Sequence, residues 1–219
     1  VHWLPPALDI EGFPQKQDWQ VRKPFRFLYV GDWHFRKGLH LLLSAWEMAF
    51  PYPGEAELTI KTSEDCPTVS SRRDVCVIRE QWSREQVFQA YPEFDAYVSA
   101  SLGEGWGMPV AEAVRAGLPV VANLWGGHAS VLREDACFPI PHEEILQPYA
   151  SVPELYAPGQ SCGFSSPGSI AEALRACARA SAGLRDSLAE KAKTHLLERY
   201  GSGAVLPSLR ERVTDLCSL

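Results

Sequence analysis

Short, continuous apolar runs alternate with longer segments of helical periodicity along most of the chain, and this alternation predicts a parallel β-sheet covered by helices. Residues 25–31 (FRFLYVG) form an apolar run that ends in glycine, which is typical of a buried strand in a parallel sheet. In residues 37–50 the large apolar side chains recur at helical spacing, and Pro51 and Pro53 end the segment. The same pattern predicts further strands at residues 56–61, 74–79, 94–99, 118–122 and 136–140.

Capping residues predict where the other helices begin and end. Ser83 and Gln86 form a capping box. Pro109 and Gly117 have the proline-first, glycine-after pattern of a short helix. The predicted helices cover residues 83–91, 109–117, 166–180, 184–200 and 203–217.

Two stretches, residues 1–24 and 141–166, carry several prolines and glycines without a steady period, and we expect both to be irregular. The fold class predicted from the remaining pattern is α/β, with a single Rossmann-like, doubly wound parallel sheet of about six strands and C-terminal helices. This domain would occupy residues 25–182, with an irregular linker at 1–24 before it. Residues 183–219 would be C-terminal helices of the same domain.

Composition narrows the classes of function. The formal net charge is −6 and no long basic run occurs, which argues against nucleic acid as a partner. No apolar run approaches the roughly twenty residues of a membrane span, and the first residues show no signal-peptide pattern, so we expect neither. The cysteines are scattered without metal-ligand spacing, which favours reduced thiols in the cytoplasm. They are Cys66, Cys76, Cys137, Cys162, Cys177 and Cys217.

The densest chemical pattern lies in residues 98–127. Glycines occupy alternate positions from 103 to 107, where they let the backbone turn sharply and let a ligand approach its N–H groups. The first N–H groups of the helix that begins at Pro109 lack partners within it, and with the helix dipole they form an anion site. Glu104 and Glu112 add hydrogen-bond acceptors beside this site. A ligand that carries both phosphate and hydroxyl groups, such as a sugar nucleotide, suits this combination.

This stretch resembles the E-G-F-G-x-P-x-x-E-A…A-x-G-x-P-V-V-A signature of retaining glycosyltransferases of the GT-B fold, the group 1 family. Residues 104–109 (EGWGMP), 112–113 (EA) and 116–122 (AGLPVVA) carry the match. The resemblance implies transfer of a hexosyl group from a UDP-, GDP- or ADP-linked sugar to an acceptor. It also implies retention at the anomeric carbon, no bound metal and no cofactor. The chain would be the donor-binding, C-terminal domain of such an enzyme.

The resemblance also implies roles for individual residues. Glu104 would contact the donor sugar and, with Lys37, act in catalysis, and Glu112 would bind the ribose hydroxyls. Arg79 follows the third predicted strand, where the family binds the base. The implied donor-binding set is Gly31, Arg36, Lys37, Arg79, Glu104, Gly105, Trp106, Gly107, Met108, Pro109, Val110 and Glu112.

One position departs from the family pattern. In the family loop G-R-x-x-x-x-K-G, the residues that match here are Gly31, Lys37 and Gly38. Asp32 occupies the arginine position, and an aspartate does not bind a diphosphate as an arginine does. Arg36, next to Lys37, is the candidate replacement.

Residues 4–9 (LPPALD) resemble the i-P-x-G-v-D segment that follows the interdomain linker in this family, which implies that the acceptor-binding domain is missing from this chain. Two alternatives stay open. The chain could be a degenerate, non-catalytic relative that binds a nucleotide sugar or serves as a scaffold, and Asp32 is the support for this. It could also be a GT-B phosphorylase or epimerase, although no context for a pyridoxal-phosphate lysine is found. His34 and His128 lie in the predicted site loops, where we expect both to be solvated.

Overall fold

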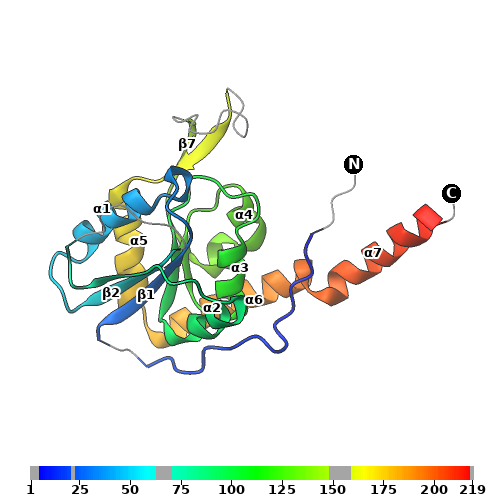
Figure 1. Ribbon diagram of the computed structural model, residues 1–219, viewed down its shortest axis with the longest axis horizontal. Helices are drawn as coiled ribbons and strands as arrows, with labels where there is room; N and C mark the ends of the chain where they lie inside the picture. Colours follow the sequence, from blue (N-terminus) through cyan, green and yellow to red (C-terminus); the bar gives the residue numbers. More distant parts are fainter. Residues whose placement is uncertain (1–4, 21–22, 63–70, 148–158, 218–219) are drawn as a thin grey trace.

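In the computed structural model, which describes residues 5–20, 23–62, 71–147 and 159–217, parallel strands form one six-stranded sheet between two layers of helices (Figure 1). The strand order is β3-β2-β1-β4-β5-β6, so the crossover direction reverses between β1 and β4. This arrangement confirms the predicted Rossmann-like sheet of about six strands. The strands are β1 (Phe25–Val30), β2 (Ala56–Lys61), β3 (Val75–Ile78), β4 (Ala96–Ser99), β5 (Val120–Ala122) and β6 (Phe138–Pro139).

The two faces of the sheet carry separate apolar cores, because successive side chains of a strand point to opposite faces. In β1, Phe27 and Tyr29 belong to the core beneath α1 (Leu39–Ala49) and α5 (Pro167–Arg179), whereas Leu28 lies in the core of the opposite face. The helices of that second face are α2 (Arg84–Ala90), α3 (Met108–Arg115), α4 (Gly127–Val131) and α6 (Ala182–Tyr200). Short 3₁₀ turns lie at η1 (Phe35–Lys37), η2 (Tyr91–Glu93) and η3 (Glu134–Ala136).

The segment 141–166, predicted to be an irregular loop, contains an antiparallel hairpin, so that prediction is wrong for its described part. The strands are β7 (Glu143–Leu146) and β8 (Ser161–Phe164), and the hairpin projects from one end of the sheet (Figure 1). Glutamate, which occurs in β7, and glycine, which occurs in β8, have low strand propensity. The hairpin therefore forms because its two strands pair with each other and pack against the domain. Residues 148–158 of the predicted loop lie outside the described residues.

The ends of the chain differ in how they contact the domain. Within residues 5–20 the N-terminal segment has no helix or strand, as predicted, but it packs on the domain. The Leu8 amide donates to the Tyr200 carbonyl (2.6 Å), and the Lys16 amide donates to the Ala116 carbonyl (2.8 Å). At the other end, α7 (Ser202–Cys217) extends away from the body of the molecule (Figure 1).

Four cysteines are free thiols in the part of the chain that the structure describes: Cys76, Cys137, Cys162 and Cys177. Cys177 is fully buried in the core beneath α5, and burial raises the pKa of its thiol. Cys66 lies outside the described residues, as does the side chain of Cys217. None of the helices formed by described residues combines the length and the apolar character that crossing a membrane requires.

Candidate functional site

The loops that follow β1 and β4 meet at the carboxyl ends of these neighbouring strands, where open α/β sheets bind their ligands. The Leu102 amide donates to the Arg36 carbonyl (2.8 Å), and so does the Ser101 hydroxyl (3.0 Å). Gly38 has φ +67°, and a Cβ at this position would lie 2.0 Å from the Ala100 carbonyl oxygen. The two loops therefore approach so closely that only glycine fits at position 38.

An ion cluster joins the two loops. Lys37 Nζ lies 2.7 Å from Glu104 Oε1, and Arg36 Nη1 lies 3.3 Å from Glu104 Oε2. The Arg36 guanidinium also donates to the Gly103 carbonyl. Two cations and one carboxylate give the cluster a net charge of +1, which suits an anionic ligand.

Glu104 stays ionised in this cluster although it is largely buried. Burial disfavours its charge, but the hydrogen bond from Lys37 and the charges of Lys37 and Arg36 outweigh that effect, so the pKa of Glu104 lies below its ordinary value. At neutral pH the carboxylate therefore neutralises part of the positive charge of both basic side chains.

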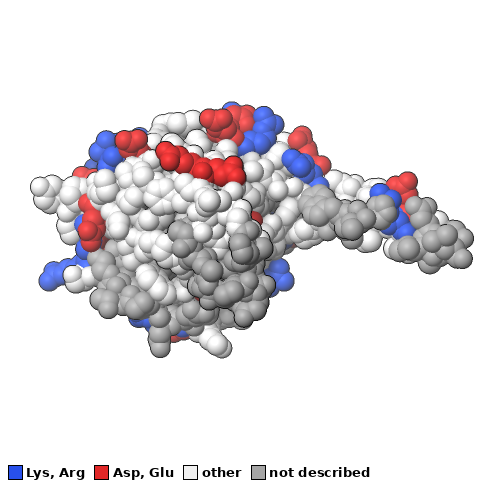
Figure 2. Space-filling model, turned by 90° about the horizontal axis from the view of Figure 1, so that it is seen from above, with Lys and Arg blue, Asp and Glu red and all other residues white. Residues whose placement is uncertain are grey.

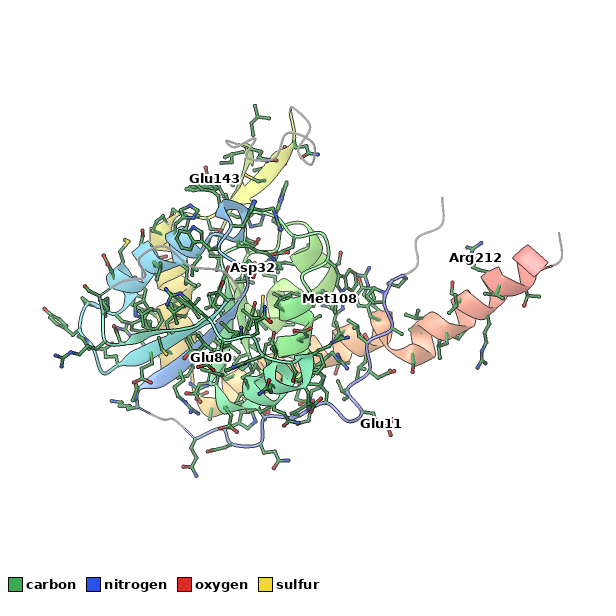
Figure 3. The ribbon with its side chains drawn as sticks, in the orientation of Figure 1. Glu11, Asp32, Glu80, Met108, Glu143 and Arg212 are labelled. Atoms are coloured by element: carbon green, nitrogen blue, oxygen red, sulfur yellow. The ribbon has the colours of Figure 1, made fainter. Side chains whose placement is uncertain are left out.

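The start of α3 faces the same region. Gly107 is the N-cap residue with φ +82° and makes no side-chain capping bond, and Pro109 lies in the first turn. A helix start without a side-chain cap leaves its first N–H groups available to an anion. Asp32, after β1, and Met108, at the first position of α3, lie near the same end of the sheet (Figure 3).

A small cavity of about 10 Å³ connects these elements. Its volume corresponds to about one water molecule. Five of the residues predicted for the site line it together: Lys37, Glu104, Gly107, Pro109 and Val110. The other lining residues are Tyr29, Val30, Tyr97, Ser99 and His128.

His128 is buried behind this cavity, so the expectation of a solvated loop histidine is wrong. Its Nδ1 lies 3.2 Å from both the backbone oxygen and Oδ1 of Asn123, and its Nε2 lies 3.4 Å from Ser99 Oγ. Burial lowers the pKa of His128 to about 4, against the opposing effect of the Glu104 charge. The imidazole is therefore neutral at physiological pH. It packs against Gly107, since a Cβ at that position would lie 3.0 Å from Cδ2 of His128.

The two glycines that precede His128, Gly126 and Gly127, are the feature of the sequence that could have indicated its burial. A Cβ on Gly127 would lie 2.5 Å from the Trp106 backbone, and a Cβ on Gly126 would lie 2.9 Å from the Glu104 carbonyl oxygen. Glycines at both positions let the loop after β5 pack against the loop after β4. This packing places His128 inside the protein.

Three of the predicted residues that do not line the small cavity have other environments. Glu112, one turn after the start of α3, accepts a hydrogen bond from the Tyr91 hydroxyl (3.0 Å), and burial raises its pKa. Arg79 is exposed just after β3, which β2 separates from β1. The Trp106 ring packs edge-on against Tyr200 (4.5 Å between centroids), so its side chain faces the core.

A larger groove of about 430 Å³ lies beside the ion cluster. The loops after β1, β4 and β5 form one side of it, and the β7–β8 hairpin forms the other. Its lining residues are Arg36, Gly103, Glu104, Gly105, Trp125, Gly126, Gln147, Gln160, Ser161 and Cys162. The hairpin residues were not predicted, because the sequence showed no strand pattern between 141 and 166. Gly31, the remaining predicted residue, directly follows β1 and donates its amide to the Lys61 carbonyl (3.0 Å).

Among the described residues, no group of three or more histidine, cysteine, aspartate or glutamate side chains has an arrangement that could hold a metal ion.

Comparison with known proteins gives three kinds of result. A family model described as "Glycosyl transferases group 1" matches residues 24–157. None of the curated proteins compared with the chain matches it. Many solved structures resemble it, and at their low sequence identity the similarity concerns the fold.

Sucrose-phosphate synthase from Thermosynechococcus elongatus superposes with a TM-score of 0.71 at 20% identity, over 98% of this chain and 52% of that one. The C-terminal domain of a glycosyl transferase group 1 family protein from Francisella tularensis gives a TM-score of 0.66 at 16% identity, over 89% and 99%. HepE of Anabaena, solved in complex with UDP and glucose, gives 0.64 at 15% identity, over 87% and 48%. The chain thus spans about half the length of the first and the third of these proteins.

Proposed function

The chain belongs to the group 1 glycosyl transferases, and on this premise we propose that it is the donor-binding domain of an enzyme that transfers a hexosyl group from a nucleotide sugar to an acceptor. We further propose that the reaction retains the anomeric configuration and proceeds without a metal ion. The observation that supports this proposal most strongly is the ion cluster at the junction of the β1 and β4 loops, beside the start of α3.

The proposed reaction places negative charge on the departing diphosphate. An enzyme accelerates such a step by stabilising this charge more strongly in the transition state than in the ground state. Lys37, Arg36 and the N–H groups near Val110 are the groups proposed to do so. Hydrogen bonds from lysine and arginine to phosphate are strong because both partners are charged.

Ligand binding would redistribute the contacts within the cluster. A diphosphate that attracts Lys37 and Arg36 competes with Glu104 for both cations. The carboxylate oxygens of Glu104 then become free to accept hydrogen bonds from sugar hydroxyls. The free protein would thus hold its two cations in place by the same carboxylate that later contacts the sugar.

The remaining roles follow the family pattern and are part of the proposal. Glu112 would bind the ribose hydroxyls, and the backbone from Gly105 to Met108 would line the sugar. Arg79, at the carboxyl end of β3, would lie near the base. HepE, whose fold is similar, was solved with UDP and glucose bound, which supports a nucleotide sugar as the ligand class.

Isothermal titration calorimetry with UDP-, GDP- and ADP-linked sugars tests the proposal. We expect one nucleotide family to bind and Lys37→Met to weaken that binding by about tenfold to a hundredfold, because a charge-assisted hydrogen bond to phosphate is lost. Lys191→Met, on the exposed side of α6, is the matched control and should bind as the unaltered chain does. Absence of nucleotide binding by well-folded chain would refute the proposal.

The scaffold alternative is favoured by one observation, the exposed Asp32 at the position of the family arginine. It predicts that Lys37→Met and Glu112→Ala leave the biological activity of the protein unchanged. The same two variants therefore separate a donor-binding enzyme domain from a non-catalytic relative.

A further inference from the structure

The β7–β8 hairpin is anchored firmly to the loops of the site. The Gly163 amide donates to the Leu102 carbonyl (2.9 Å), and the Asn123 side chain donates to the Gly163 carbonyl (3.4 Å). A Cβ on Gly163 would lie 2.5 Å from the Trp125 side chain, so β8 lies directly against this ring. The Trp125 ring also contacts the His142 ring edge-on, with 5.9 Å between centroids. These contacts pack the hairpin against the loops that form the rest of the groove.

Two glutamines lie at the same level of this hairpin. The backbone N–H of Gln147 donates to the backbone carbonyl of Gln160 (2.9 Å), one residue beyond the paired residues Leu146 and Ser161. Both glutamines and Ser161 line the same groove as Arg36 and residues 103–105. The hairpin therefore contributes two residues with side-chain amides, Gln147 and Gln160, to the lining of the groove.

The charges divide the groove into two parts. Its basic side chain, Arg36, comes from the β1 loop and pairs with Glu104, whereas the lining residues from the hairpin are uncharged. On the face that carries the hairpin, the visible lysine and arginine side chains lie towards the rim (Figure 2). A diphosphate is therefore favoured at the ion cluster, and a neutral, hydroxyl-rich group is favoured beside the hairpin.

Glutamine suits such a group because its side-chain amide both donates and accepts hydrogen bonds, as a sugar hydroxyl does. Trp125 also lines this groove, and its ring provides an apolar surface against which a ligand can pack. The groove volume of about 430 Å³ lies within the range of small-molecule sites.

We propose that Gln147 and Gln160 bind hydroxyl groups of the sugar carried by the nucleotide, so that the β7–β8 hairpin determines which sugar the domain accepts. This inference rests on the proposed function, because it assigns the sugar part of the same nucleotide-sugar site. It adds a wall of the site that the sequence did not predict.

The test compares each nucleotide sugar with its nucleoside diphosphate by isothermal titration calorimetry: UDP-glucose with UDP, GDP-mannose with GDP, and ADP-glucose with ADP. In Gln147→Ala and Gln160→Ala we expect affinity for the nucleotide sugar to fall roughly tenfold per lost hydrogen bond, with the affinity for the diphosphate unchanged. Leu146→Ala is the matched control, since this side chain is 71% exposed on the same hairpin and does not line the groove.

The outcomes separate this inference from the proposed function. Unchanged affinity for the nucleotide sugar in a variant that combines Gln147→Ala and Gln160→Ala would overturn the role of the glutamines while leaving the donor-binding proposal intact. Equal loss of affinity for sugar nucleotide and diphosphate would also overturn it, because the hairpin would then only support the fold of the site. If the unaltered chain binds no nucleotide, the proposed function fails, and the inference fails with it.

Discussion

Replacing Glu104 by glutamine removes one charge from the ion cluster and keeps the size of the side chain. In the native protein this carboxylate accepts contacts from Lys37 (2.7 Å) and Arg36 (3.3 Å). In Glu104→Gln the two cations remain close together without their carboxylate. We expect the variant to be less stable than the native chain at neutral pH.

The magnitude follows from the exposure of the three side chains. The exposed fraction of the side chain is 11% for Glu104, 20% for Lys37 and 28% for Arg36. The cluster is therefore intermediate between an ion pair on the surface and a fully buried one. Exposed ion pairs contribute about 0.2–1 kcal/mol, whereas breaking a buried pair costs about 3–5 kcal/mol. We therefore expect Glu104→Gln to lower the free energy of unfolding by about 1–2 kcal/mol at pH 7.

The pH dependence of this loss has a definite sign. Because the pKa of Glu104 is lowered in the folded state, its carboxylate stabilises the fold fully above the ordinary carboxyl pKa of about 4. That contribution is lost as the pH falls through the folded-state pKa. The difference between native chain and variant should therefore shrink towards zero in acid.

Urea unfolding of both proteins at pH 7 and at more acidic pH values measures these differences. Glu190→Gln is the matched control, because Glu190 pairs with Lys193 on the surface of α6 and is 59% exposed. It should change stability by less than about 0.5 kcal/mol. A Glu104→Gln variant as stable as the native chain at pH 7, or a difference that does not depend on pH, would refute the ion-cluster reasoning.

Three further predictions test other parts of the site. Gly38→Ala should lower the free energy of unfolding by more than about 2 kcal/mol in urea titrations, because its Cβ meets a backbone oxygen, whereas Gly12→Ala, with φ +72° and open space, should cost only about 1 kcal/mol. Since burial lowers the pKa of His128 to about 4, the native chain should lose stability as the pH falls from about 6.5 to 4, by about 3 kcal/mol, and His128→Gln should flatten that slope of unfolding free energy against pH. Asp32→Arg should tighten binding of the nucleoside diphosphate severalfold in calorimetry, since it restores the cation that the family loop G-R-x-x-x-x-K-G has at this position; unchanged affinity would show that position 32 does not reach the phosphates.

Most of the layered fold could be predicted from the chain alone because its evidence is local. The apolar run that begins at Phe25, the helical spacing after Lys37 and the proline and glycine at the two ends of the 109–117 helix each report the state of a single segment. The hairpin could not be predicted in this way, because β7 has weak strand propensity and pairs with β8, which packs against Trp125.

The candidate site divides in the same way. The glycine spacing from 103 to 107 predicted an anion site at the start of the 109–117 helix, and the family resemblance added Lys37 and Arg36 to that site. The sequence could not show which acidic residue pairs with which basic residue. Glu104 contacts Lys37 and Arg36, which lie 67 and 68 positions away in the chain. Likewise, burial of His128 and the bond between Glu112 and Tyr91 depend on how separate helices pack.

By itself, the sequence determined that the chain would form a parallel α/β sheet with glycine-rich loops after its first and fourth strands, since each of these features is encoded within a few neighbouring residues. The tertiary structure alone decided that Glu104 holds both cations, that His128 is neutral and buried, and that a hairpin closes the groove. These features depend on strand order and on backbone approaches of a few ångströms between distant segments. Apolar periodicity carries no information about either.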